Sequence, residues 1–235
     1  MALQKKLVQA MITGAVGVGA AGLLTGVGAV LAGRAVWNAL TTTSLNGKVA
    51  LITGASRGLG PALAEECARN GCRLAICGRD PQSLQRAESK LRGRGAEVLA
   101  LRCDIAQRGE VEEMVRKVIA HFGHIDLLIN NAGTIAVGPL QAQTPEDFQE
   151  AMDVMFWGVV HTTLLVLPHM RERRQGRIAT ITSIGGKVAV PHMIPYSAAK
   201  FAATGFSEGI TAELAGEGIK VTTVIPGLMR TGSHI

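Results

Sequence analysis

The stretch TGASRGLG, from Thr53 to Gly60, follows a short apolar run and leads into an amphipathic one. Its glycines, Gly54, Gly58 and Gly60, let the chain turn tightly and bring backbone N–H groups close to a pyrophosphate. Pro61 suits the first turn of a helix, where no needed N–H donor is lost. Many glycine-rich turns bind nothing, but one placed between a strand and a helix predicts the phosphate-binding turn of a dinucleotide-binding sheet.

Around this turn, short apolar runs alternate with longer amphipathic stretches. The runs predicted as strands are Lys48–Thr53, Arg73–Cys77, Val98–Arg102, Ile125–Asn130, Arg177–Thr182 and Lys220–Ile225. Strands that alternate with helices form a parallel sheet through right-handed crossovers, and ligands then bind at the carboxyl ends of the strands. The sequence therefore predicts an α/β fold, a doubly wound parallel sheet of Rossmann type with the strand order 3-2-1-4-5-6.

The composition supports one such domain and argues against nucleic acid as a partner. The chain has 235 residues, enough for one sizeable domain with an appendage, and 47% of them are hydrophobic. The net charge of +6 is spread without any run of five basic residues, and aromatic residues make up only 3%. Without a basic stripe or an aromatic stacking platform, nucleic acid is not an expected partner.

The cysteines Cys67, Cys72, Cys77 and Cys103 contain no CxxC pair. Cysteine-rich metal sites are usually marked by such close spacing, so we expect no metal ion. The thiols are expected to act as small buried hydrophobic groups in a reducing compartment.

The end of the second predicted strand bears on the choice of cofactor. It is Gly78, followed by Arg79, whereas an acidic side chain would be needed to hold the ribose 2′-hydroxyl of NAD(H). Arg57 in the glycine-rich turn and Arg79 can instead form charge-assisted hydrogen bonds to a 2′-phosphate. The alternative for each arginine is an ordinary surface charge. The expected cofactor is NADP(H).

A second group of polar residues lies further along the chain. Tyr196 and Lys200 are four apart on a predicted helix and so share one face. An ammonium beside a phenol favours the phenolate, which suits a general acid or base. Ser183, at the end of the preceding strand, can hydrogen-bond a carbonyl or alcohol oxygen. A YxxxK pattern alone is often an exposed helix face, but these three residues together form the predicted catalytic set.

Together, these motifs resemble those of the short-chain dehydrogenase/reductase family, in its single-domain TGxxxGxG branch. The resemblance runs from Asn46 to Thr231 and includes RCDIA around Asp104, NNAG at Asn130–Gly133 and PGLMRT at Pro226–Thr231. The residues that the resemblance places at the cofactor are Gly54, Ser56, Arg57, Gly58, Leu59, Gly60, Arg79, Asp104, Asn131, Ala132, Gly133, Tyr196, Lys200, Pro226, Gly227 and Thr231.

The resemblance also implies a reaction, reversible hydride transfer between the nicotinamide and a carbonyl or secondary alcohol. Tyr196 would move the proton, Ser183 would orient the substrate, and Lys200 would hold ribose hydroxyls. We expect a lipophilic substrate, because few charges surround Val188–Ile194 and the amino terminus is apolar. Family members pair through the long helices before and after the serine strand, so a homodimer is expected.

Two departures from the family pattern concern catalysis. A catalytic asparagine in the family stands three residues before a glycine, and the register DVMFWGVV puts Met155 there. A thioether cannot replace an amide donor and acceptor. The sequence also stops at Ile235, so we expect a domain that is incomplete at its C-terminal end and lacks the final strand. The alternative function is a scaffold or regulatory protein that binds NADP(H) with little turnover.

The amino terminus has a different character. Leu7–Gly33 contains no charged residue and is long enough to cross a bilayer, which takes about 20 residues. Gly22 and Gly26 form a GxxxG face that permits close helix pairing in lipid. We expect a membrane anchor in residues 1–35, a linker in 36–46 and the domain in 47–235, on the cytoplasmic side. The alternative is a secretory signal whose cleavage would leave a soluble protein.

Overall fold

The computed structural model describes residues 44–227 of a chain that divides into two units between Leu45 and Asn46. The described helices and strands all belong to the second unit. The apolar segment Leu7–Gly33, most of the predicted linker and Thr231 lie outside the described residues. The structure therefore addresses the predicted domain.

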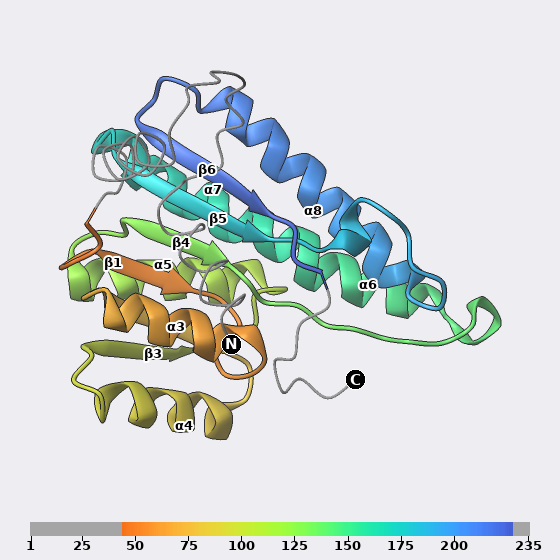
Figure 1. Ribbon diagram of the computed structural model, residues 1–235, viewed down its shortest axis with the longest axis horizontal. Coiled ribbons are helices and arrows are strands. Elements are labelled where there is room, and N and C mark those ends of the chain that lie inside the picture. Colours follow the sequence, from red (N-terminus) through yellow and green to blue (C-terminus); the bar gives the residue numbers. More distant parts are fainter. Residues whose placement is uncertain (1–43, 228–235) are drawn as a thin grey trace, which may run out of the picture. The chain divides into compact units, whose positions relative to one another are not determined.

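A parallel sheet of six strands forms the centre of this unit, in the order β3-β2-β1-β4-β5-β6 (Figure 1). Its strands are β1 (Val49–Ile52), β2 (Arg73–Gly78), β3 (Val98–Arg102), β4 (Leu127–Asn130), β5 (Gly176–Ile181) and β6 (Ile219–Val224). Each overlaps a predicted strand, and the predicted doubly wound order is confirmed. Within residues 44–227, β6 pairs with β5 alone and forms one edge of the sheet.

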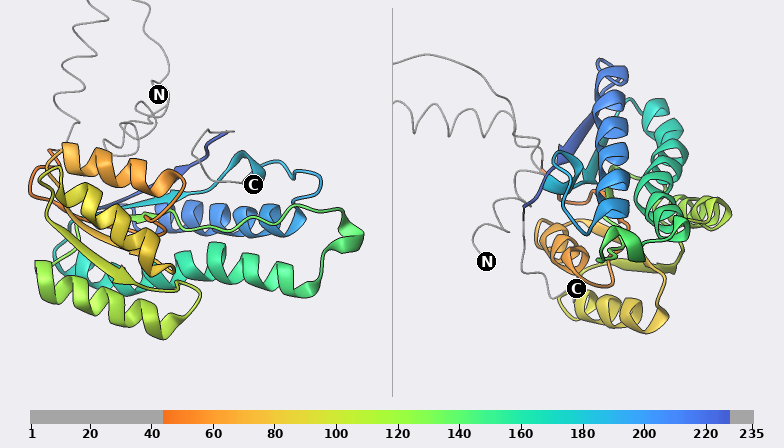
Figure 2. Two further views of the ribbon diagram at one scale, coloured as in Figure 1. Left: turned by 90° about the horizontal axis from the view of Figure 1, so that it is seen from below. Right: turned by 90° about the vertical axis from the view of Figure 1, so that its right-hand side faces the viewer.

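Helices cover both faces of the sheet (Figure 2). One face carries α3 (Leu59–Arg69) and α4 (Pro81–Arg92), and the other carries α5 (Arg108–Phe122), α7 (Gly158–Glu172) and α8 (Ile194–Glu213). Helix α6 (Pro145–Met152) continues through a π-helical segment, η2 (Asp153–Trp157), directly into α7. Short 3-10 turns, η1 (Leu140–Ala142) and η3 (Ile184–Gly186), lie in the loops after β4 and β5.

Burial on both faces explains why the strands are continuous apolar runs. Every residue of β1 and β4, the two central strands, is buried. Leu51 and Leu128 are fully covered, as are their neighbours in the sheet. Each aliphatic side chain buried in this way stabilises the fold by about 1.5–3 kcal/mol. The core therefore fixes where the strands end, and with them the loops that carry the polar motifs.

At the amino end of the sheet, a buried carboxylate ties β1, β4 and the end of α7 together. Asp126 accepts hydrogen bonds from Arg173 (2.8 Å) and the backbone N–H of Val49 (3.0 Å), and it also contacts Lys48 (3.4 Å) and His124 (3.0 Å). Burial by itself would raise the pKa of Asp126, but the hydrogen bonds and nearby cations outweigh it and hold the pKa below its ordinary value. Sequence reasoning missed this cluster.

One continuous helical stretch within residues 44–227, Pro145–Glu172, is long and apolar enough to span a membrane, with a hydropathy of 1.4. Its apolar window is 56% buried inside the domain, and α7 packs on β4 and β5. Burial against the sheet accounts for its composition. This stretch is separate from the predicted anchor in residues 7–33.

Candidate active site

The glycine-rich turn lies between β1 and α3, at the carboxyl end of the sheet. Gly54 has a φ of +63°, and a Cβ atom there would lie 2.6 Å from the Cα of Ala132. A Cβ atom at Gly60 would lie 2.2 Å from the carbonyl oxygen of Gly54. Neither position has room for a side chain, so the backbone itself forms the surface that a phosphate can approach.

The NNAG stretch after β4 braces this turn. Thr53 Oγ1 accepts hydrogen bonds from the N–H groups of Asn131 (3.0 Å) and Ala132 (3.1 Å). The side-chain amide of Asn131 donates to the carbonyl oxygens of Thr53 (2.9 Å) and Gly54 (3.1 Å). The side chain of Asn131 therefore holds the glycine-rich turn in shape.

The end of β2 lies beside the same turn. A Cβ atom at Gly78 would lie 2.8 Å from Ser56 Oγ, so a carboxylate side chain at this position would have to displace Ser56. Arg57 and Arg79 are both exposed. The next acid in the sequence, Asp80, is engaged as the N-cap of α4, where it accepts a backbone hydrogen bond of 2.8 Å. Two guanidinium groups, one in the glycine-rich turn and one just after β2, are thus exposed, and the carboxylate of Asp80 is engaged in capping α4.

Asp104 lies just past β3, whose Arg102 is the register partner of Gly78 in β2. One of its carboxylate oxygens accepts the N–H of Ala106 (3.1 Å), and its own N–H donates to Glu110 (2.9 Å). The side chain is therefore held in a local turn near the end of β2. The resemblance places the adenine end of the cofactor at this corner.

Ser183, Tyr196 and Lys200 come together beyond the carboxyl end of β5. Ser183 Oγ accepts the N–H of Gly185 at 3.1 Å. A Cβ atom at Gly185 would lie 3.0 Å from Cε1 of Tyr196 and 3.5 Å from Ser183 Oγ, so the serine and the phenol flank the same glycine. Lys200 Nζ lies 5.8 Å from the centre of the Tyr196 ring.

Lys200 is buried, and its Nζ donates to the carbonyl oxygen of Ile181 at 2.8 Å. Burial lowers the pKa of Lys200 to about 8, because surroundings of low polarity disfavour the ammonium. Met155 is fully buried beside it: a Cβ atom at Gly133 would lie 3.6 Å from the Met155 sulfur and 3.9 Å from Lys200 Nζ. A thioether therefore stands near the lysine, where the resemblance puts an amide.

The PGLMRT segment is described only as far as Gly227. Pro226 is buried, and its carbonyl oxygen accepts the N–H of Ile184 at 3.0 Å. The start of this segment therefore meets the loop that follows Ser183.

Large exposed apolar side chains lie on the segments that follow β4 and β5. They come from the loop after β4, the loop after β5 and the first residue of α8, and both loops extend beyond the carboxyl ends of the strands (Figure 1). The six residues, referred to below as the apolar rim, are 36% to 62% exposed: Ile135, Val137, Leu140, Ile184, Val188 and Ile194. Residues 131–145 include no charged side chain. Sequence reasoning had marked only the uncharged part around Val188–Ile194.

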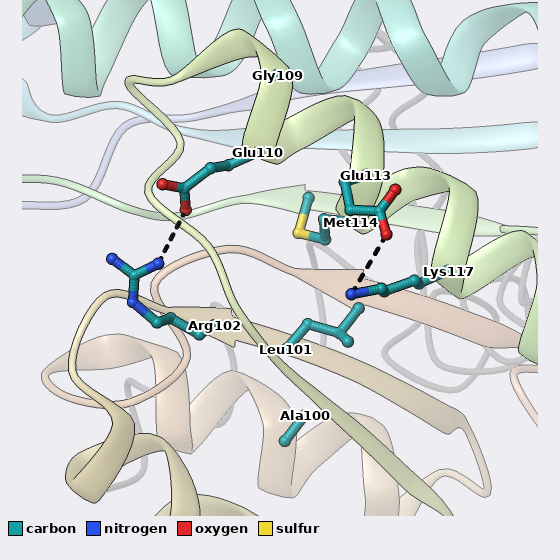
Figure 3. Close-up of a pocket in the computed structure, with 8 residues that line it drawn as sticks. All are labelled: Ala100, Leu101, Arg102, Gly109, Glu110, Glu113, Met114 and Lys117. Carbon is teal, nitrogen blue, oxygen red and sulfur yellow. Dashed lines mark hydrogen bonds and ion pairs between the residues drawn. The ribbon is translucent and has the colours of Figure 1, made fainter.

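A pocket of about 500 Å³ lies elsewhere, at the edge of the sheet between β3 and α5 (Figure 3). Its lining consists of Ala100, Leu101, Arg102, Gly109, Glu110, Glu113, Met114 and Lys117. The charged groups there pair with one another, Arg102 with Glu110 (3.4 Å) and Lys117 with Glu113 (3.3 Å). None of the predicted catalytic residues lines this pocket, so it is not the candidate active site.

Comparison with known proteins identifies the family. The family model described as short chain dehydrogenase matches residues 48–234. The chain belongs to the short-chain dehydrogenase family. This short-chain dehydrogenase is 39% identical over 191 residues to SadH of Mycobacterium tuberculosis, an oxidoreductase by name, covering 80% of this chain and 69% of that protein. It is also 39% identical over 192 residues to the dehydrogenase/reductase SDR family protein 7-like of Drosophila melanogaster, covering 80% and 59%.

Solved structures resemble this short-chain dehydrogenase in sequence and in fold. A variant actinorhodin polyketide ketoreductase with NADPH is 35% identical with a TM-score of 0.77, over 81% of this chain and 74% of that one. A short-chain dehydrogenase from Burkholderia phymatum in complex with NAD is 32% identical with a TM-score of 0.79, over 81% and 69%. The protein is therefore an oxidoreductase of a fold that binds nicotinamide cofactors.

Proposed function

We propose that this short-chain dehydrogenase transfers hydride between NADP(H) and a carbonyl compound or secondary alcohol. The observation that carries the proposal is the meeting of Ser183, Tyr196 and Lys200 around Gly185 and the end of β5. Lys200 Nζ also lies near Gly133, in the stretch that braces the glycine-rich turn. Tyr196, Ser183 and the glycine-rich turn therefore lie at the same carboxyl end of the sheet, where Tyr196 can serve as the proton donor.

The residues present fit the cofactor and divide the work of the reaction. When bound, the nicotinamide supplies or accepts the hydride. During reduction, the phenol of Tyr196 gives its proton to the carbonyl oxygen, and Ser183 Oγ donates a hydrogen bond to the same oxygen. Lys200 uses one N–H for Ile181 and keeps further donors for ribose hydroxyls. Alcohol oxidation reverses the proton transfer.

The preference for NADP(H) is supported by the positive charges in the glycine-rich turn and just after β2. Arg57 and Arg79 are exposed and able to pair with a 2′-phosphate, while Asp80 is engaged at its helix cap. The similar structures include both an NAD and an NADPH complex, so the test is direct titration of the full chain with each cofactor. A preference of tenfold or more for NAD(H), about 1.4 kcal/mol, would contradict the proposal.

A lipophilic substrate is supported by the apolar rim. Exposed aliphatic groups on the loops after β4 and β5 and at the start of α8, the helix that carries Tyr196, favour an apolar chain on the substrate. A series of ketones and aldehydes of increasing chain length should therefore show a falling KM. Turnover confined to small polar ketones would contradict this part of the proposal.

The experiment on the reaction itself is Tyr196→Phe. The ring stays but the hydroxyl is lost, so NADPH oxidation with a carbonyl panel should fall by about 100-fold or more while NADPH binding stays within about twofold. Spectrophotometric assays and cofactor titration measure the two quantities. An unchanged rate would remove Tyr196 from the mechanism.

The second candidate function, a cofactor-binding scaffold with little turnover, is favoured by Met155. Its thioether lies beside Lys200 and cannot relay a proton as an amide can. Tight NADPH binding by the native chain without oxidation across a broad carbonyl panel would support the scaffold and contradict the enzyme.

We further propose membrane attachment through residues 7–33 and pairing of two copies through α7 and α8. The pairing is supported by large apolar side chains that are exposed on these helices. Trp157 and Leu164 are seven residues apart, at the start of α7 and within it, and Phe201 is exposed on α8. Liposome flotation of the full chain tests the first proposal, with residues 36–235 as the comparison. Sedimentation of a Leu164→Glu variant tests the second, and an unchanged association state would contradict it.

A further inference from the structure

Two loops that flank the predicted substrate side are joined by a small hydrogen-bonded group. The N–H of Gly138, in the loop after β4, donates to the carbonyl oxygen of His192 at 2.9 Å. The side-chain amide nitrogen of Gln143 donates to the carbonyl oxygens of Gly138 (2.8 Å) and His192 (3.2 Å). One amide group therefore joins segments 49 residues apart in the chain.

The orientation of the Gln143 amide is fixed by its partners. Both are carbonyl oxygens, which only accept hydrogen bonds, so the amide nitrogen has to face them. The position of the residue is fixed as well, because it directly precedes Thr144, the N-cap of α6. Thr144 and Asp147 form a capping box, with a hydrogen bond of 2.8 Å from the Thr144 N–H. Gln143 thus connects a firmly held helix start to the opposite loop.

The opposite end of this connection is a strained turn. Val190 to Met193 form a turn closed by the Met193 N–H and the Val190 carbonyl oxygen at 3.2 Å, with Pro191 second and His192 third. His192 has a φ of +64°, a left-handed conformation that favours glycine at the third position of such a turn. The hydrogen bonds that its carbonyl oxygen accepts from Gly138 and Gln143 hold this conformation.

The turn leads directly into the helix that carries the proton donor. Met193 is the N-cap of α8, and Tyr196 lies in the first turn of that helix. On the helix side, Ser197 Oγ accepts the N–H of Val190 at 3.2 Å. The backbone before Tyr196 is therefore held from two directions, by Ser197 in the helix and by Gln143 in the loop after β4.

We propose that Gln143 is a positioning residue for the substrate side of the site: its amide holds the left-handed turn at His192 and so sets the spacing between Tyr196 and the loop after β4. The inference rests on the proposed carbonyl reduction for its kinetic readout. Substrate affinity then depends on Gln143, although the residue lies in neither the glycine-rich turn nor the catalytic set.

The experiment compares Gln143→Leu, Gln143→Glu and a control, Gln141→Leu, in the full chain. Leu keeps the size but loses the donor, and Glu keeps the polarity and shape but places acceptors against two carbonyl oxygens. Both changes should raise the KM for a lipophilic ketone by about tenfold, as for one lost hydrogen bond, with kcat and NADPH affinity within about twofold. Gln141 is exposed in the same 3-10 turn, and its change should leave KM unaltered.

A second variant separates positioning from general destabilisation. Glycine adopts a left-handed backbone freely, so His192→Gly added to Gln143→Leu should return KM to within about threefold of the native value. A double variant as poor as Gln143→Leu, or a KM unchanged in Gln143→Leu and Gln143→Glu, would overturn the proposal.

Amide hydrogen exchange tests the connection without turnover. Exchange in residues 186–193 should be faster in Gln143→Leu than in the native chain, and unchanged in Gln141→Leu. Equal exchange in the native chain and Gln143→Leu would overturn the inference even if the enzyme is active. Absence of turnover in the native chain would contradict the proposed function alone, because the exchange result is independent of it.

Discussion

The nucleotide end and the substrate end of this site are built differently. At the nucleotide end, Gly54 and Gly60 pack backbone against backbone, and Asn131 locks the turn with two hydrogen bonds. At the substrate end, exposed apolar side chains stand on loops joined through the amide of Gln143 and one backbone hydrogen bond. The nucleotide end has no room for added side-chain atoms at Gly54 and Gly60, whereas the exposed side chains at the substrate end can be replaced without a steric clash. Cofactor binding and substrate choice should therefore respond to different substitutions.

The largest expected effect comes from adding a methyl group at the nucleotide end and comparing it with the same change at the substrate end. Gly54→Ala places a Cβ atom 2.6 Å from the Cα of Ala132, at a φ of +63°, and should weaken NADPH binding by about 100-fold or more. Gly138→Ala is the matched control, because no heavy atom lies within 4 Å of its added Cβ. Its NADPH affinity should stay within about twofold in a fluorescence titration. Similar losses in both variants would contradict the difference between the two ends.

Lys200→Met should stabilise the cofactor-free protein while removing turnover. The pKa of Lys200 is about 8 in the folded state, below the value of about 10.4 for an unfolded chain. The buried ammonium therefore destabilises the fold at every pH below 8, and stability rises from pH 8 to about 10.4 as the folded state loses its proton first. Met should raise the free energy of unfolding by on the order of 2 kcal/mol at pH 7.

Denaturant unfolding at pH 7 and pH 10 checks this prediction. The native chain should gain stability between the two pH values relative to Lys200→Met, since the variant has no proton to lose at this position. A variant less stable than the native chain at pH 7 would mean that the hydrogen bond to Ile181 outweighs the cost of burial.

Met155→Asn tests the region where the two ends meet, because Met155 and Lys200 both lie close to Gly133. An amide there restores a donor and an acceptor beside the lysine, so turnover should rise by about tenfold with NADPH affinity unchanged. Steady-state rates with the best carbonyl substrate provide the measurement. An equal or lower rate in a folded variant would show that the thioether does not limit proton transfer.

The smallest expected effect lies at the opposite end of the strands. Asp126→Asn should lower the free energy of unfolding by about 1 kcal/mol at pH 7 and leave KM unaltered. Because hydrogen bonds hold the folded pKa of Asp126 below its ordinary value, this stabilisation is present above pH 4 and is lost as the pH falls through the folded pKa. The difference in unfolding free energy between the native chain and Asp126→Asn should therefore be largest at pH 7 and shrink as the pH is lowered below about 4. A change in KM would mean that the contacts of Asp126 influence the geometry of the active site.

The parts of the fold that sequence reasoning predicted are those fixed by burial. Each strand was predicted to within two residues of its observed ends, because parallel strands covered on both faces are continuous apolar runs. For the site, the four-residue spacing of Tyr196 and Lys200 predicted that they share one face of a helix, which is α8, and their combination with Ser183 as a catalytic set stays a prediction.

The parts that could not be predicted depend on single backbone angles and long-range contacts. His192 adopts a left-handed conformation that Pro191 only suggests, and nothing in the local sequence marks Gln143 as its partner. The pairing of Arg173 with Asp126 joins residues 47 apart. Such contacts exist only once the sheet has formed, so no periodicity reports them.

The π-helical segment Asp153–Trp157 gives the long helix an internal change of phase. A π turn takes up more backbone than an α turn, so α6 and α7 are rotated relative to the faces that an uninterrupted α-helix would present. Converting this segment to α geometry at unchanged length would rotate α6 by about 100° relative to α7, because the residue that the π turn absorbs would then add its own helical rotation. The loop that carries Gln143, directly before α6, would turn with it, while α7 stayed packed on the sheet. Helical phase is therefore a variable through which the substrate side can be redesigned without touching any residue that meets the reacting atoms.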